Sequence, residues 1–283
     1  MNINLKSKLQ QDNVFVNVER KSLSQLAGMN SIKGLDHVII SEDKIVNIVS
    51  DSYGLLTNED YYLKIEESLI EADIKYDIRS INRDNRSFAL DYILNDDSLA
   101  INVKNGLDKI KPMLRFTNSY DGSTKTSGHF GFFREVCSNG LHVSQTNIGF
   151  SVKHRGDIVE IILPQINTIV EKFMDNEYYS LQRKFEVLAE TPIYDINLFV
   201  QKVCGKTALF QFESSEKNPD PSLNAKIVIE TIKKESNLLG TNPNLWLGYN
   251  AFNEILHIKF KKGFENQKKL DNEIFAEIFQ MAN

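Results

Sequence analysis

Four side chains in the middle of the chain are of types that bind metals or carry out nucleophilic chemistry. They are His129, Cys137, His142 and His154. Their spacing matches no common zinc pattern, and successive residues of a strand point to opposite faces. Cys137 and His142 could form a thiol–imidazole pair, but no third residue stands out to orient the imidazole. We therefore predict no metal site and no cofactor.

Motifs of common enzyme classes are also absent from the sequence. It contains no glycine-rich phosphate loop that ends in Lys-Ser or Lys-Thr, and no dinucleotide-binding fingerprint. No spaced set of acidic residues typical of a nuclease stands out. An unrecognised hydrolase would need Asp121, His129 or His142 in one pocket. The sequence thus favours a protein that is not an enzyme.

Charge is unevenly distributed along an acidic chain. The 283 residues carry a net charge of −5, which disfavours uniform wrapping of DNA by a basic surface. Residues 36–100 contain fifteen acidic and six basic side chains, a net charge of −9. Residues 102–155 contain three acidic and eight basic side chains, a net charge of +5. Charge runs are usually solvated faces, and the alternative is a basic face that binds phosphate locally.

The basic segment also contains aromatic residues that could stack on unpaired bases. On a strand, Phe130 and Phe132 point to one face and Phe133 to the other, so at least one set is expected to be buried. Two loops of turn-forming residues, around Asp121 and Asn139, could add a phosphate-binding edge. The predicted nucleic-acid interface consists of Arg115, Lys125, Arg134, Lys153, Arg155 and Phe132.

The elements that must position these residues begin with a β-rich half. Residues 1–35 show no sustained period and are expected to form a partly ordered arm that packs late or contacts a neighbour. Alternating and β-branched runs in residues 36–155 predict an antiparallel meander with a tight turn at Asp121-Gly122. One helix interrupts it, capped by Asn58 and extending to about residue 73.

The second half, residues 156–283, is predicted to be helical. Apolar residues recur at near-helical spacing over residues 166–188 and predict one long helix that ends before Pro192. Shorter helices are predicted over residues 194–203, from Ser222, over 244–258 and over 272–281. This order predicts an α+β protein in which helices pack on a central antiparallel sheet, with residues 36–283 as a single domain.

Three segments resemble the core signature of the phage- and plasmid-like proteins, a family whose defining domain has no assigned function. They are residues 49–54 with Asn58-Glu59, residues 118–123 with 137–140, and residues 245–254. Tyr120 departs from the pattern, which has a histidine before Asp-Gly, so this chain could not share a chemical role of that histidine. The resemblance implies a mobile-element setting and supplies no catalytic residues.

The helix of the third segment carries an aromatic and polar stripe. Trp246, Tyr249 and Asn253 lie at positions i, i+3 and i+7 and therefore share one face. Such a stripe usually docks a helix onto a sheet and hydrogen-bonds a loop. The alternative is a contact surface for a neighbouring subunit or nucleic acid.

These observations lead to two functional hypotheses. The first is a non-enzymatic nucleic-acid-binding protein of a phage, plasmid or other mobile element, which binds or anneals single-stranded DNA or RNA. The second is an oligomeric interaction or assembly protein, either a phage structural component or an inhibitor of a host protein. Cys137 and Cys204 do not make a disulfide framework, and the sequence shows neither a signal peptide nor an apolar membrane-spanning run. A cytoplasmic location is therefore expected.

Overall fold

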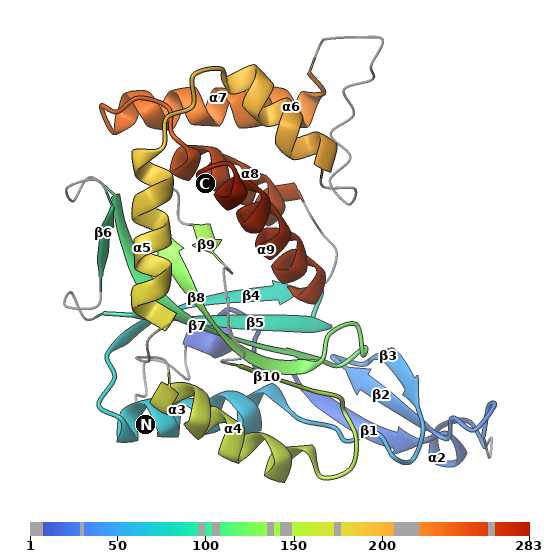
Figure 1. The fold of residues 1–283 in the computed structure, drawn as a ribbon. Coiled ribbons are helices and arrows are strands. Elements are labelled where there is room, and N and C mark those ends of the chain that lie inside the picture. The colour runs from blue at the N-terminus through green and yellow to red at the C-terminus, as the bar shows by residue number, and fades with distance from the viewer. Residues whose placement is uncertain are drawn as a thin grey trace. The chain divides into compact units, whose positions relative to one another are not determined.

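The computed structural model describes residues 8–28, 31–95, 100–103, 108–134, 139–141, 149–172, 177–206, 221–259 and 264–283 (Figure 1). Contacts divide the chain into two compact units. Unit 1 comprises residues 1–96, 113–130 and 146–173, and unit 2 comprises residues 97–112, 131–145 and 174–283. Strands β7 (Asp108–Ser119) and β8 (Thr126–Arg134) contribute residues to both units. This division does not coincide with the predicted boundary after residue 35.

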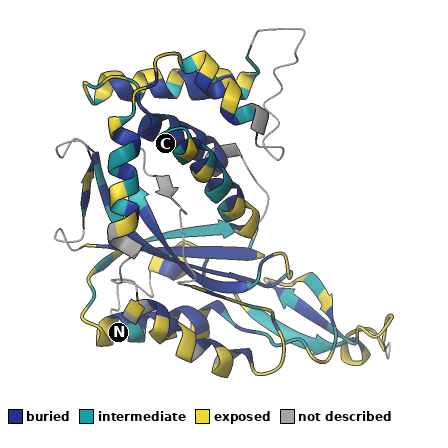
Figure 2. Cartoon of the chain, in the orientation of Figure 1, coloured by how far each residue is buried: buried dark blue, intermediate teal, exposed yellow. Residues whose placement is uncertain are grey.

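The predicted α+β class is confirmed, with antiparallel strands gathered in the first half of the chain and helices in the second. In unit 1, the strand order is β10-β8-β7-β5-β4. The strands that complete it are β4 (Tyr76–Arg83), β5 (Ser87–Leu94) and β10 (Gly149–Val152). β5 is buried along its whole length, as the dark blue colour in Figure 2 shows. Its polar residues Ser87 and Asp91 are therefore buried with its apolar ones.

Helices α3 (Asn58–Glu71) and α4 (Ile158–Lys172) lie side by side on one face of this sheet (Figure 1). Tyr61 of α3 anchors the packing, since its hydroxyl donates to the backbone carbonyl of Ser127 at 2.9 Å. The helix begins as predicted, but its capping residue is Thr57 and not Asn58. The Thr57 hydroxyl accepts a hydrogen bond from the backbone N–H of Asp60 at 3.0 Å.

A second, smaller sheet in unit 1 has the order β1-β2-β3. Its strands are β1 (Val18–Ser22), β2 (His37–Ser41) and β3 (Lys44–Val49), and the short helix α2 (Leu23–Ala27) follows β1. Ile39 and Val49 form an apolar cluster with Phe88 and Tyr120, which joins this sheet to the larger one. Part of the predicted N-terminal arm is therefore a strand that pairs with β2 along its full length.

Unit 2 is organised around α8 (Leu245–Lys259), which packs against α5 (Glu177–Glu190), α7 (Leu223–Leu238) and α9 (Phe264–Gln280). α6 (Ile196–Lys206) packs against α7 and α9. The short strands β6 (Ile101–Val103) and β9 (Asn139–Leu141) pair with β7 and β8, respectively. The core is aromatic: the ring of Phe185 lies 4.8 Å from that of Trp246 and 5.9 Å from that of Phe275.

The structure describes two helices, α4 and α5, in the range where a single long helix was predicted over residues 166–188. α4 ends at Lys172 and α5 begins at Glu177, while residues 173–176 lie outside the described residues. Each helix buries its own apolar face, with Ile166 and Ile169 in unit 1 and Leu181 and Phe185 in unit 2. The spacing of apolar residues alone does not show in which unit a helical segment packs.

Two other elements of the structure differ from the prediction. The last helix begins at Phe264, earlier than the predicted residue 272, and buries Phe264, Gln267 and Leu270 in its first turns. β4 was not predicted, because its residues are mostly half-buried and do not alternate cleanly between apolar and polar. None of the described helices is both long and apolar enough to cross a membrane.

Candidate functional site

Two of the sequence motifs meet in unit 1 at the side chain of Asn118. Its Nδ2 donates to the backbone carbonyl of Leu56 at 3.0 Å and to Oδ1 of Asn58 at 2.9 Å. Its Oδ1 accepts from the hydroxyl of Thr126 at 3.0 Å. Asn118 is fully buried, and these bonds satisfy both Nδ2 protons and its carbonyl oxygen. One amide thus ties β7 to β8 and to the start of α3.

His154, just after β10, extends this network. Its Nε2 lies 3.3 Å from the hydroxyl of Thr126. Because that hydroxyl donates its single proton to Asn118, the imidazole must carry its own proton on Nε2 to complete the bond. The ring stacks on Tyr53 with centroids 5.2 Å apart. Burial lowers the pKa of His154, so the ring is neutral at neutral pH.

Tyr120, which stands where the resemblance led us to expect a histidine, has a structural role. Its hydroxyl accepts a hydrogen bond from the backbone N–H of Asn58 at 2.8 Å. That N–H belongs to the first turn of α3, where the helix itself offers no acceptor. The ring packs edge-on against Phe88 at 5.2 Å. Burial raises the pKa of Tyr120, so the phenol stays protonated.

Two loops meet beside His154. The backbone N–H of Gly54 donates to the carbonyl of His154 at 3.3 Å, and the N–H of Gly156 donates to the carbonyl of Ser52 at 3.1 Å. A Cβ atom at position 54 would collide with the carbonyl oxygen of Gly156, so only glycine permits this approach. Residues 50–54 therefore fix the position of the segment that carries Lys153 and Arg155.

Three predicted interface residues lie together at this end of the sheet, and we call Lys125, Lys153 and Arg155 the basic loop. The last pair of the β8–β10 ladder is Thr126 with Val152. Lys125 is the residue just before β8, and Lys153 is the residue just after β10. Lys153 and Arg155 are exposed on either side of the buried His154, and Lys125 is half-buried.

Arg115 does not belong to this surface, because it is buried against Asp91 on the neighbouring strand β5. Its Nε bonds one carboxylate oxygen of Asp91, and its Nη2 bonds the other at 2.6 Å. Arg79 adds a further bond to Asp91 at 2.6 Å. Burial opposes ionisation of Asp91, but the two guanidinium groups outweigh it and hold its pKa below the usual range.

Arg134 and Phe132 are buried in unit 2. The Arg134 guanidinium bonds the carboxylates of Asp108 and Glu235, each at 2.7 Å, and lies 5.8 Å from the ring centroid of Trp246. Phe132 packs edge-on against a core ring at 5.1 Å. Arg115, Arg134 and Phe132 thus present no surface to a phosphate or base, and we exclude them from the interface.

The stripe on α8 is also buried. Tyr249 and Asn253 donate to the two carboxylate oxygens of Asp271 on α9, at 2.8 and 3.0 Å. The indole N–H of Trp246 donates to Asp108 at 2.7 Å. Tyr249 and Asn253 thus hydrogen-bond another helix, whereas the prediction had the stripe dock its helix onto a sheet; Trp246 reaches Asp108 at the start of β7.

The side chains considered for metal binding or nucleophilic chemistry do not form a described site. His129 and His154 are buried in unit 1, while Cys137 and His142 lie outside the described residues. Cys204 is a half-buried free thiol on α6. Burial raises its pKa to about 12, so it is protonated and a poor nucleophile at neutral pH.

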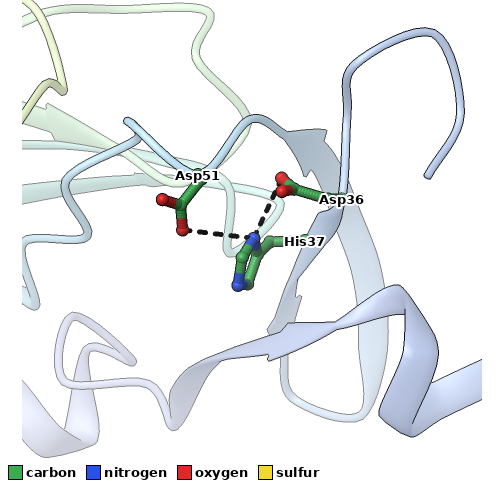
Figure 3. Close-up of side chains that lie close together, drawn as sticks. All are labelled: Asp36, His37 and Asp51. Atoms are coloured by element: carbon green, nitrogen blue, oxygen red, sulfur yellow. Dashed lines mark hydrogen bonds and ion pairs between the residues drawn. The ribbon is translucent and has the colours of Figure 1, made fainter. Parts of the chain in front are cut away.

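The structure brings together one group that sequence analysis missed, formed by Asp36, His37 and Asp51 (Figure 3). Nδ1 of His37 lies 3.1 Å from Oδ1 of Asp36 and 3.9 Å from Oδ1 of Asp51. The spacing of the three residues fits no familiar motif. The group could have been predicted only from the β2–β3 hairpin. This hairpin places His37 opposite Val49, two residues before Asp51.

Comparison with known proteins identifies a family but no activity. A family model described as a domain of unknown function, DUF932, matches residues 46–269. That range includes Asn118, His154, the basic loop and α8, whereas Asp36 and His37 lie outside it. No curated protein and no solved structure matches the chain.

We predict that Asp91→Asn destabilises the protein by about 3–5 kcal/mol, because it leaves Arg115 buried without its charged partner. The free energy of unfolding in urea measures this loss. Asp77→Asn on the adjacent strand is the control, since Asp77 is exposed and its replacement should cost no more than about 0.5 kcal/mol. Equal urea midpoints for the two variants would contradict the prediction.

The ion pair of Asp91 and Arg115 also predicts how the stability of the protein changes with pH. The folded-state pKa of Asp91 is lowered, so its contribution to stability is fully present above the unfolded-state pKa of about 3.9. It is lost as pH falls from that value through the folded-state pKa. The wild-type protein should therefore lose more stability than Asp91→Asn over this acid range.

Proposed function

The chain belongs to the DUF932 family, defined by a domain of unknown function, and for this member we propose that the basic loop binds the phosphates of nucleic acid. We further propose single strands as the ligand, since a flexible backbone can bring successive phosphates to a small group of cations. The resemblance to phage- and plasmid-like proteins supports a mobile-element setting, and we propose a cytoplasmic location.

The observation that carries this proposal is the way His154 holds the two cations on either side of it. His154 is buried, hydrogen-bonded and stacked, whereas Lys153 and Arg155 are exposed. Because the backbone between them is fixed by the bonds to residues 52 and 54, little loop entropy is lost on binding. Lys125 and Lys153 follow the same end of the β8–β10 ladder, so Lys125 lies close to the two exposed cations in the backbone register.

The burial of the aromatic residues defines the kind of binding that we propose. Phe116, Tyr120, Phe130 and Phe132 are each at most 1% exposed, so these residues offer no stacking platform for bases. Binding through phosphates alone gives little sequence preference and a strong dependence on salt. The net charge of −5 restricts contact to the basic loop and keeps the affinity modest.

We predict that Lys153→Glu/Arg155→Glu lowers the affinity for a labelled single-stranded oligonucleotide at least tenfold, as measured by fluorescence anisotropy. The plot of log affinity against log salt should become shallower by roughly 0.7 for each phosphate that the variant no longer binds. Lys233→Glu/Lys234→Glu is the matched control, because it reverses two exposed lysines on α7. Wild-type affinity and salt slope in the basic-loop variant would refute the proposal.

Self-association is a second candidate function, favoured by the exposed apolar residues around the small sheet. Five aliphatic side chains on or beside it are at least 36% exposed: Leu26, Ile32, Leu35, Ile45 and Ile48. β3 is an edge strand of that sheet, and an edge strand offers unpaired backbone groups to another chain. Exposed apolar residues next to such an edge are typical of protein–protein contacts, and we propose a second copy of this chain as the partner.

We expect the wild-type protein to be oligomeric by light scattering coupled to size exclusion, and Ile45→Lys/Ile48→Lys to shift it to monomer. The two lysines place charges on the edge strand and oppose its pairing. Ile161→Lys is the control, because Ile161 is also exposed but lies on α4. A monomeric wild-type protein, or an oligomer unaffected by the double substitution, would reject this function.

A further inference from the structure

We propose that Asp36, His37 and Asp51 bind a divalent transition-metal cation, with Zn²⁺ as the preferred ion. One donor atom from each residue lies within 4.8 Å of the others, and Figure 3 shows the imidazole facing both carboxylates. Two carboxylates balance the charge of a divalent ion, and an imidazole nitrogen favours Zn²⁺ over Mg²⁺. Water would complete the coordination, as in open metal sites.

The separations of the donor atoms are close to those that a metal requires. Metal–ligand bonds of about 2.0–2.2 Å place neighbouring ligand atoms about 3.0–3.5 Å apart. The separation of 3.1 Å between His37 and Asp36 already meets this condition, and that of 3.9 Å between His37 and Asp51 must shorten slightly. The side chain of Asp51 is 83% exposed, so its carboxylate has room to rotate towards the other two.

The backbone that carries two of the ligands is fixed from both sides. In β2, His37 pairs with Ser22 of β1 and with Val49 of β3. Asp36 donates its N–H to the carbonyl of Val49 at 3.1 Å, and its carbonyl accepts from the N–H of Leu23 at 2.8 Å. Ligands on paired strands are held more precisely than ligands on a free loop.

Arg20 provides the means to distinguish a metal site from a simple ion-pair cluster. Its Nη2 bonds Oδ1 of Asp51 at 3.1 Å and the carbonyl oxygen of the same residue at 2.8 Å. A cation bound by Asp51 must displace this guanidinium or share the carboxylate with it. Removal of the Arg20 charge should therefore strengthen metal binding, because it removes both competition and repulsion.

The proposal stands independently of nucleic-acid binding, because it is tested with metal alone. Isothermal titration of the full 283-residue chain, without a histidine tag, should show one Zn²⁺ site and much weaker binding of Mg²⁺. His37→Gln and Asp51→Asn should each weaken Zn²⁺ binding at least tenfold, and Arg20→Gln should strengthen it several-fold. Circular dichroism verifies that each variant is folded.

Asp43→Asn is the matched control. It removes one carboxylate from the turn at the other end of the β2–β3 hairpin, where Asn also accepts the positive φ of 61°. This variant should bind Zn²⁺ as the wild type does. Absence of wild-type binding would overturn the proposal, and so would Zn²⁺ binding that survives both His37→Gln and Asp51→Asn in folded protein. Failure of this test would leave the phosphate-binding proposal untouched.

Discussion

The buried amide of Asn118 is the contact on which the arrangement of unit 1 depends. A primary amide buried in a sheet must find partners for its two protons and its oxygen, or the fold loses free energy. Asn118 finds them at Leu56, Asn58 and Thr126. Those partners belong to the segment that starts α3 and to β8, so the requirement of one side chain joins elements far apart in the sequence. His154 and Tyr53 then attach the two surface loops to the same network.

The basic segment of the sequence contains two kinds of cationic side chain, buried and exposed. Arg115 and Arg134 satisfy buried carboxylates, each within its own unit, and stabilise the interior. Lys153 and Arg155 remain at the surface because the intervening His154 points inward. The net charge of +5 over residues 102–155 therefore produces only a small basic surface. This distribution agrees with an acidic protein that makes only a few phosphate contacts.

The sequence allowed prediction of features that depend on local order, and failed for those that depend on distant partners. The α+β class and the approximate start of α3 followed from the period of the apolar residues, although the cap itself was assigned to Asn58 and not to Thr57. The burial of Arg115 could not be predicted in this way, because its partner Asp91 lies on another strand. The assignment of α4 and α5 to different units was not predicted, because both helices show the same near-helical spacing of apolar residues. The group of Asp36, His37 and Asp51 arises only when a hairpin has closed.

If the Asn118 network holds the basic loop in a form that binds phosphate, the substitution Thr126→Val should weaken that binding. This change removes the hydroxyl shared by Asn118 and His154 while it keeps the side-chain shape and every cation of the basic loop. Fluorescence anisotropy with a single-stranded oligonucleotide should show several-fold weaker binding than the wild type in a variant that remains folded. Wild-type affinity in Thr126→Val would contradict the account, as would the absence of binding by the wild-type protein.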